Sequence, residues 1–584
     1  MTFLPTLGYE YNEREVTDTF RGYNHNLVIG EGEFYCTKNL SSRCFPLLAN
    51  RPRRGSVTRL AAPGGLLAKE KLAWIDGGTL YYDAQATPLQ SMRPGKKQLV
   101  GMGAYLCIFP DKLYYNTADP SDFGSMEAEY RSTGAVEYAL CQEDGTEYPA
   151  PTVSDAAPDE PESGALWLDT GVTPHTLRRW SGIYGEWTTV ESVCTRLRFI
   201  SEGELPGLFR QGDGVLISGA EPEEINGDKI LCAVGGGEGE RDWLVVIGLL
   251  EQALRQTEGS VHIERKVPDM DFVIECRNRL WGCRYGLSEG KMLNEIYCCA
   301  LGDFKNWRQY QGLSTDSWTA SVGSDGPWTG AISYLGYPTF FKENRIHRVA
   351  VSPIGAHQIT ETVCRGVQEG CANSLQVVNE TLLYKSRADI CAYQGGFPES
   401  ISAALGDECY SEAAAGVAGE RYYLSMRDAA GSWQLFVYDL RRGLWMREDA
   451  LHATAFARLG DELYALTAEG ELLALLGSAG DKESFVEWEA ETGLLYYQMP
   501  DRKYVSRFNL RLSLEDGAEL TVDIMYDSSG EWVRQGKIRM KGTRTVTLPV
   551  RPRRCDHLRL RLRGRGEMRL YSLARILTIG SDVG

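Results

Sequence analysis

The sequence has no long apolar run. Its longest, LVVIGLL at 244–250, has the length of a strand, whereas a membrane-spanning helix needs about 18 apolar residues or more. The opening residues, MTFLPTLGYEYNERE, contain no basic segment followed by an apolar one, so the sequence predicts no secretory signal. We therefore expect a protein that is made in the cytoplasm and has no contact with a membrane.

Clustered metal ligands and catalytic motifs are missing as well. The seven His are isolated, with no HExxH or HxH, and none of the 15 Cys forms a CxxC pair. Such spacings would be needed for a zinc site, so we predict no metal and treat the thiols as small, buried, reduced side chains. The segment GGGEGE at 235–240 lacks the Lys-Ser/Thr of a phosphate-binding loop. The sequence predicts no cofactor and no catalytic residue, and His347 is interpreted as a residue at the end of a strand.

Apolar residues also show little of the 3.6-residue spacing of helices. The chain has 584 residues, including 63 Gly, 23 Pro, 30 Tyr and 13 Trp. This length suggests several domains, and aromatic-rich strand patterns between glycine turns favour an all-β architecture. The stretch from Arg277 to Val349 shows this pattern most clearly.

Four segments share one form, a strand, a turn and a second strand. Two of them end in Leu-Tyr-Tyr, at 80–82 and 113–115, and looser copies occupy 379–396 and 462–475. Repetition of a strand unit is typical of propeller blades. We therefore predict a β-propeller.

The repeats are interrupted, which predicts inserted modules and further domains. We expect an N-terminal arm with the first blades at 1–147, followed by a Pro-rich and acidic linker with a Trp-rich β-module at 148–200. An inserted small β-barrel is expected at 201–265, the remaining blades at 266–484, and a basic C-terminal β-sandwich at 485–584.

The Trp-rich module offers one candidate binding site. Trp167, Trp180 and Trp187 are spaced through short strand patterns. Exposed tryptophans can stack on sugar rings, so the three are candidates for glycan binding. They are equally the residue type that fills the core of a very small module, and the sequence leaves both interpretations open.

Charge is divided unevenly along the chain. The net charge is −17, yet residues 500–584 hold 18 Lys and Arg against 10 Asp and Glu. Within this region Arg559, Arg561 and Arg563 alternate with leucines, which places the arginines on one face of a strand. That face is either simply solvated or a contact for an acidic neighbouring subunit.

Acidic residues of the central stretch raise the question of glycosidase chemistry, which needs two facing carboxylates. Asp303, Asp316 and Asp325 each lie in a turn pattern, LGDF, STDSW and GSDGPW. Turn formation is the simpler explanation, because Asp side chains bond nearby backbone in turns. We carry the three as possible subunit contacts and keep a propeller glycosidase, with Asp316 or Asp325 acting, as an alternative.

Several motifs resemble one family. RNRLWGCRYG, then LGDFKNW, TDSW and YPTFFKENRIHRV, are similar to the propeller pattern of tail nozzle and head-to-tail stabilisation (neck) proteins of tailed bacteriophages. NLSSRCFPLLANRPRRG resembles the N-terminal segment of those proteins, and GDGVLISG resembles small barrels inserted in phage neck and tail proteins. The C-terminal sandwich and the WLDTG unit depart from the nozzle pattern and look closer to tail-tip modules.

The resemblance implies a structural virion protein that is not an enzyme. Its partners would be copies of itself in a ring, expected to be a hexamer, and other neck or tail proteins, with DNA only in transit during ejection. The protein would be assembled in the host cytoplasm and end in the virion. A carbohydrate-binding tail-tip or adhesion protein is the main alternative.

Overall fold

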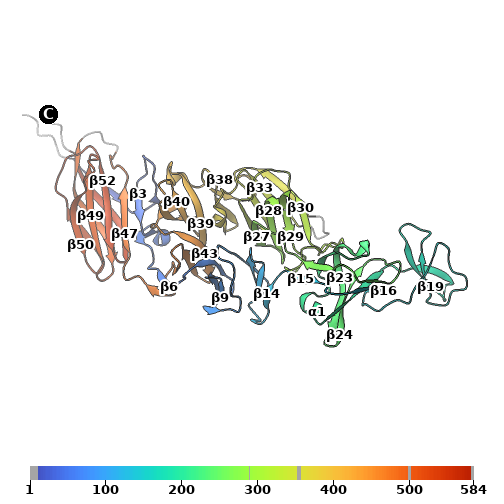
Figure 1. Ribbon diagram of the computed structural model, residues 1–584. Coiled ribbons are helices and arrows are strands. Elements are labelled where there is room, and N and C mark those ends of the chain that lie inside the picture. Colours follow the sequence, from blue (N-terminus) through green and yellow to red (C-terminus); the bar gives the residue numbers. More distant parts are fainter. Residues whose placement is uncertain (1–10, 289, 352–356, 498–501, 580–584) are drawn as a thin grey trace, which may run out of the picture.

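The computed structural model describes residues 11–288, 290–351, 357–497 and 502–579, and almost all of its regular elements are strands. Four parts follow one another along an elongated molecule (Figure 1): a β-sandwich, a β-propeller, a small barrel and a Trp-rich module. The predicted fold class is confirmed. No helix among the described residues is long and apolar enough to cross a membrane.

Seven sheets form the blades of the propeller. The first blade contains β7 (Pro63–Ala68), β8 (Leu72–Asp76), β9 (Thr79–Tyr82) and β10 (Gln85–Ala86), and the second contains β11 (Gln98–Met102), β12 (Tyr105–Phe109), β13 (Leu113–Asn116) and β14 (Phe123–Ser125). The third contains β27 (Phe272–Glu275), β28 (Leu280–Ser288), β29 (Lys291–Cys298) and β30 (Trp318–Ser321). The fourth contains β31 (Gly330–Tyr334), β32 (Tyr337–Lys342), β33 (Arg345–Ala350) and β34 (Gln358–Val363).

The other three blades are the fifth, sixth and seventh along the chain. The fifth blade contains β35 (Gln376–Val378), β36 (Thr381–Lys385), β37 (Ile390–Tyr393) and β38 (Glu399–Ser400). The sixth contains β39 (Tyr410–Ala418), β40 (Arg421–Asp428), β41 (Trp433–Asp439) and β42 (Leu444–Arg447). The seventh contains β43 (Ala453–Leu459), β44 (Glu462–Thr467) and β45 (Glu471–Ala474), together with β6 (Gly55–Arg59) and β46 (Asp481–Lys482).

The first strands of the blades form a closed circle. β7 lies beside β11, β11 beside β27, β27 beside β31, β35 beside β39, β39 beside β43, and β43 beside β7. The turn η3 (Ala372–Ser374), just before β35, contacts β31. Closure joins the last blade to the first, so each innermost strand is covered on both sides by a neighbouring blade.

The repeats found in the sequence are the second and third strands of four blades, the pairs β8–β9, β12–β13, β36–β37 and β44–β45. Local chemistry explains one of these hairpins. Gly77 and Gly78 follow Asp76 at the β8–β9 turn and have φ of 57° and 92°. Such tight turns need positive φ at central positions, which glycine adopts without strain.

The sandwich is built from both ends of the chain. One sheet contains β4 (Leu40–Ser41), β5 (Leu48–Asn50), β53 (Met568–Ile579), β48 (Lys503–Leu514) and β51 (Gly542–Pro549), with β1 (Tyr11–Thr17) paired to β53. The facing strands are β3 (Glu33–Lys38), β47 (Glu487–Thr492), β52 (Leu558–Arg565), β49 (Glu519–Tyr526) and β50 (Val533–Arg539). The sequence assigned 1–147 to an arm and blades, but its first strands complete this sandwich.

One sheet runs from the propeller into the sandwich. β42, the last strand of the sixth blade, pairs with β2 (Gly22–Tyr23), and β2 pairs with β3. A single core continues across this junction, from Leu435 and Val437 of β41 to Leu560 of β52. Burying a leucine of this kind contributes about 1.5–3 kcal/mol, so propeller and sandwich are held together by apolar packing.

The inserted barrel has eight strands in one curved sheet: β15 (Ala128–Arg131), β26 (His262–Arg265), β22 (Gly214–Ser218), β23 (Gly227–Gly237), β24 (Glu240–Ile247), β21 (Cys194–Glu202), β16 (Val136–Cys141) and β25 (Leu254–Gln256). Tyr130 of β15 and Tyr138 of β16 share one core with α1 (Leu205–Leu208) and the other strands. The sequence placed the start of the barrel at 201, but its first strands precede the Trp-rich module, because their partners come after it.

Buried polar contacts fix the barrel to the propeller. Arg265 forms a buried ion pair with Asp213, and both are inside the barrel near its junction. Asn306, from the loop between β29 and β30, accepts a hydrogen bond from Gly214 N at 3.0 Å and donates one to Gly212 O at 2.8 Å. These partners satisfy an otherwise costly buried amide.

The Trp-rich module is inserted within the barrel and lies at the end of the molecule (Figure 1). Its strands are β17 (Thr152–Ser154), β18 (Leu166–Asp169), β19 (Thr176–Ser181) and β20 (Glu186–Thr189), and they pair only with one another among the described residues.

Candidate functional surfaces

The three predicted tryptophans pack together but are not equally exposed. Trp167 is buried, whereas Trp180 and Trp187 are half-buried on neighbouring strands. Trp187 packs edge to face on both others, with ring centroids at 5.4 Å from Trp167 and 5.3 Å from Trp180. Trp167 therefore belongs to the core of the module, and only the other two present ring surface to a ligand.

The tip of the same module exposes apolar side chains. Ile183 and Tyr184, in the turn between β19 and β20, are 90% and 76% exposed. No sequence motif marked these two residues, because a single Ile-Tyr pair in a turn carries no pattern. With Trp180 and Trp187 they form an apolar end surface that suits contact with a ligand or another protein.

The arginine row lies on β52 as the alternation predicted. Arg559 lies 3.1 Å from Glu491, and Arg561 and Arg563 lie 3.5 and 2.9 Å from the same carboxylate, Asp523. Asp523 is almost fully buried. The arginines are thus partnered within their own sheet, and the charge they offer to a neighbouring subunit is largely compensated.

The three predicted aspartates lie in separate places and have separate partners. Asp303 pairs with Arg210 of the barrel at 3.0 Å. Asp316 is buried and accepts hydrogen bonds from Gln311 N and Leu313 N, which corrects its assignment to a subunit contact. Asp325 is exposed and accepts the Tyr285 hydroxyl hydrogen bond at 2.7 Å. The three carboxylates belong to three local networks and do not share one site.

A cluster around His347 was not recognised in the sequence. His347 lies within β33, not at its end, and is fully buried. Its Nε2 lies 2.8 Å from Ser324 Oγ and 3.2 Å from Glu361 Oε2. Burial lowers the pKa of His347 to about 4, although Glu361 opposes this shift. Both partners approach the same ring nitrogen, so Ser324 and Glu361 are not placed at opposite nitrogens as in a catalytic triad.

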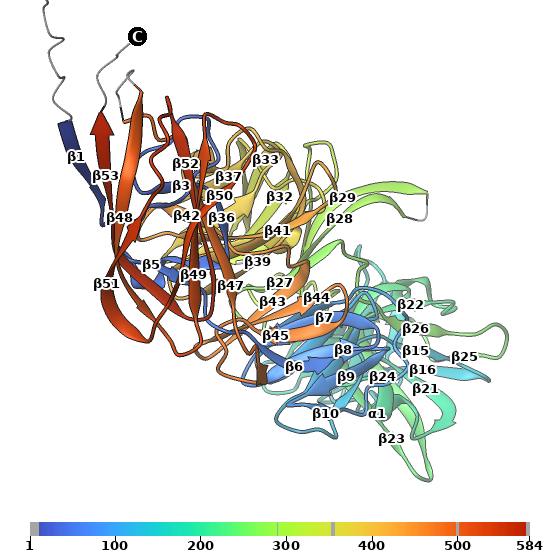
Figure 2. The ribbon, with the colours of Figure 1, turned by 90° about the vertical axis from the view of Figure 1, so that its left-hand side faces the viewer.

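A projecting ribbon is the most unusual surface of the propeller. β28 and β29 pair along their whole length, but β27 reaches only to Cys283 of β28 and β30 only to Glu295 of β29. Their outer parts pair with no third strand among the described residues and extend beyond the blade (Figure 2). Leu287 and Met292 face each other there and are 74% and 56% exposed.

Within the described part of the chain, no group of three or more His, Cys, Asp or Glu side chains is placed to hold a metal ion.

No protein-family model and no curated protein matches the sequence. Solved structures do match. One is an exo-β-1,3-galactanase from Phanerochaete chrysosporium, 9% identical over 52% of this chain and 94% of that chain, with a TM-score of 0.22. Another is a glycoside hydrolase family 43 arabinoxylan arabinofuranohydrolase from Bacillus subtilis, 10% identical over 50% and 92% of the two chains, with a TM-score of 0.17.

Both matches are glycoside hydrolases. They contradict the prediction that this chain is not an enzyme, and that prediction is withdrawn. At these TM-scores the likeness assigns neither a substrate nor a reaction to the chain.

Proposed function

We propose that this protein is a structural subunit of a phage neck or tail ring, in which copies of the chain surround a passage for DNA. The observation that carries the proposal is the ribbon formed by the outer parts of β28 and β29. An isolated two-stranded ribbon is only marginally stable in water. This one also exposes an apolar cross-strand pair, and its two outer edges pair with no other strand among the described residues. A neighbouring copy that covers the ribbon would therefore stabilise it.

The construction of the body supports the same role. The sandwich shares a sheet and a core with the propeller, and buried polar contacts fix the barrel to it. A subunit that must hold its shape against neighbours benefits from such continuous packing. The basic C-terminal region and the acidic remainder of the chain also favour a head-to-tail contact between copies.

Electron microscopy of the purified full chain, with native mass spectrometry, tests the proposal. We expect closed rings at micromolar concentration, and presence of the protein in phage particles. A chain that stays monomeric at every concentration and is absent from particles contradicts the proposal.

The ribbon gives a sharper test. Leu287→Asp places a charge in the contact and should shift the population from rings to monomers. Ile247→Asp is the matched control, because Ile247 is 53% exposed on β24 of the barrel, away from the ribbon. Rings that persist in Leu287→Asp, or that are lost equally in both variants, would show that the ribbon is not the contact.

Glycan binding by the Trp-rich module is a second candidate, favoured by the exposed end surface of Trp180, Ile183, Tyr184 and Trp187. A glycan array with the wild-type chain and Tyr184→Ala tests it. Tyr184 is in an exposed turn, so its removal should not unfold the module. Binding that is absent, or unchanged in the variant, rules this candidate out.

A further inference from the structure

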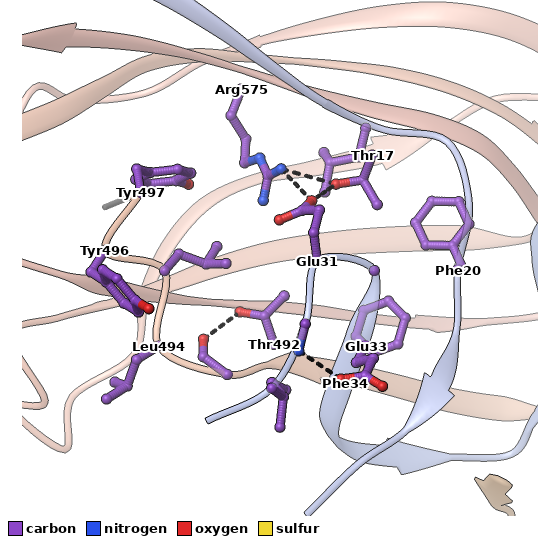
Figure 3. Close-up of a pocket in the computed structure, with 16 residues that line it drawn as sticks. Thr17, Phe20, Glu31, Glu33, Phe34, Thr492, Leu494, Tyr496, Tyr497 and Arg575 are labelled. Atoms are coloured by element: carbon purple, nitrogen blue, oxygen red, sulfur yellow. Dashed lines mark hydrogen bonds and ion pairs between the residues drawn. The ribbon is translucent and has the colours of Figure 1, made fainter. Parts of the chain in front are cut away.

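A small cavity lies where the first strands of the chain meet the last (Figure 3). It has a volume of about 180 Å³, is partly open to solvent, and is bounded by the loop that precedes β3, the segment after β47, and β53. Its walls include the aromatic and apolar side chains of Phe20, Phe34, Tyr496, Tyr497 and Leu573. They also include one buried cation, Arg575. Because these residues come from both ends of the chain, the cavity exists only in the folded sandwich.

Two buried donors at this cavity have no hydrogen-bond partner within the part of the chain that the structure describes. Arg575 is 1% exposed; its Nη2 donates to Thr17 Oγ1 at 2.9 Å and to Glu31 Oε1 at 2.5 Å, but its Nε is unpartnered. The Tyr497 hydroxyl is also buried without a partner. An unsatisfied buried donor costs about 1–3 kcal/mol, so a molecule with acceptor oxygens is expected to occupy the space beside them.

The charges around the cavity favour a neutral molecule. Glu31 already compensates the Arg575 guanidinium, and the Glu33 carboxylate on the rim accepts a hydrogen bond from Gly30 N at 2.6 Å. A second anion would therefore meet two carboxylates while being taken out of water, which is costly. A hydroxyl group has no such penalty, since it can accept from Arg575 and Tyr497 and donate to Glu31.

The size and the walls of the cavity narrow the class of ligand further. A cavity of about 150 Å³ is enough for benzene, so this one has room for a single six-membered ring. Tyrosine rings, such as the one of Tyr497 with its centroid 5.5 Å from the Arg575 guanidinium, pack well against the C–H faces of a sugar. We infer that the cavity binds one neutral sugar ring, either a free monosaccharide or the end unit of a glycan.

Ligand-observed NMR and calorimetry on the full chain test the inference. The probes are D-glucose, D-galactose and N-acetyl-D-glucosamine with their methyl glycosides, and phenol and sodium benzoate for comparison. We expect saturable binding of at least one sugar, with a Kd of roughly 1 mM for so small a ligand. Binding of the methyl glycoside as well as the free sugar would identify a glycan end, and binding of the free sugar alone a monosaccharide.

Tyr497→Phe removes only the unpartnered hydroxyl and should weaken sugar binding about three- to tenfold, without lowering the stability of the ligand-free chain. Tyr571→Phe is the matched control, because Tyr571 is on β53, the strand that contains Arg575, but outside the cavity; this variant should bind as the wild type does.

Three results would overturn the inference: no saturable sugar signal, equal binding by Tyr497→Phe, or a preference for phenol or benzoate. Sugar binding that is lost in Trp180→Ala but kept in Tyr497→Phe would belong to the Trp-rich module and would also overturn it. The inference is independent of ring assembly, which Tyr497→Phe should leave intact.

Discussion

Asp523 shows how single ionised residues are used in this molecule. Its carboxylate is almost fully buried on β49, where an uncompensated charge would be strongly unfavourable. Arg561 and Arg563 on the neighbouring strand supply the opposite charge, and the Arg561 guanidinium also lies 4.1 Å from the centroid of the Trp532 ring. The arginines of β52, which could also face a partner, therefore compensate a buried charge within their own sheet.

His347 leads to a prediction about pH. A histidine has a pKa of about 6.5 in the unfolded chain, and burial lowers the pKa of His347 to about 4 in the folded state. Between these values the unfolded chain binds a proton that the folded one does not. The stability contributed by neutral His347 is thus present above pH 6.5 and is lost as the pH falls toward 4, by about 3 kcal/mol at most.

Thermal unfolding between pH 4 and 7 measures this effect. His347→Gln should lower stability at pH 7 but show a smaller loss on acidification than the wild type. Equal slopes for His347→Gln and the wild type would contradict the prediction.

At the scale of elements, β6 is the strand that closes the propeller. It is the fourth strand of the seventh blade and pairs with β45, although it precedes every other blade strand in the chain. The last blade is thus assembled from two distant segments. β6 also pairs with β46 and lies close to the turn before it.

Gly55 makes that approach possible, and its replacement is the prediction at this scale. A Cβ atom at Gly55 would lie 1.8 Å from the backbone oxygen of Ala479, so Gly55→Ala must displace backbone. We expect a loss of about 1–3 kcal/mol or more, because overpacking against backbone cannot be relieved by a side-chain rotation. Chemical denaturation and limited proteolysis of the seventh blade measure it.

Gly396→Ala is the matched control. Gly396 lies in the loop between β37 and β38, where a Cβ would meet nothing within 4 Å. This variant should stay within about 0.5 kcal/mol of the wild type. If Gly55→Ala were equally harmless, the close packing of β6 would not be what holds the blade closed.

At the scale of the whole molecule, local patterns in the sequence predict the parts but not the way they join. The strand pairs that end at Tyr82 and Tyr115 are each formed by residues close together in the sequence. The alternation at 558–563 likewise separates buried leucines from half-exposed arginines correctly. Pairing over long distances leaves no such trace. Thr17 bonds to Arg575 across 558 residues, and nothing in either segment alone indicates the other.

The candidate sites follow the same rule. The contact of Trp180 with Trp187 could be anticipated, because the residues lie seven apart around one turn. The cavity at Arg575, the ribbon and the His347 cluster could not be. The cavity depends on segments from both ends of the chain. The ribbon depends on how far β27 and β30 extend along their neighbours, and the His347 cluster on which side chains meet inside a blade, and neither leaves a motif in the sequence.

The Trp-rich module is the part whose removal the rest of the molecule should tolerate. Its buried residues Leu166, Leu168 and Leu177 belong to none of the cores of the barrel or propeller. The chain leaves and re-enters the barrel at neighbouring points, since Cys141 pairs with both Glu147 and Cys194. Replacing 150–190 by a short Gly-Ser linker should therefore close only a small gap.

Calorimetry of this deletion variant should show the unfolding of propeller, barrel and sandwich at the wild-type temperature, within about 2 °C. The hydrogen bonds of Asn306 that join barrel to propeller are untouched by the change. A barrel transition that moves to much lower temperature would show that the module stabilises its host. Unchanged rings in the variant would place ring contacts elsewhere, whereas their loss would move the subunit contact from the ribbon to this end of the molecule.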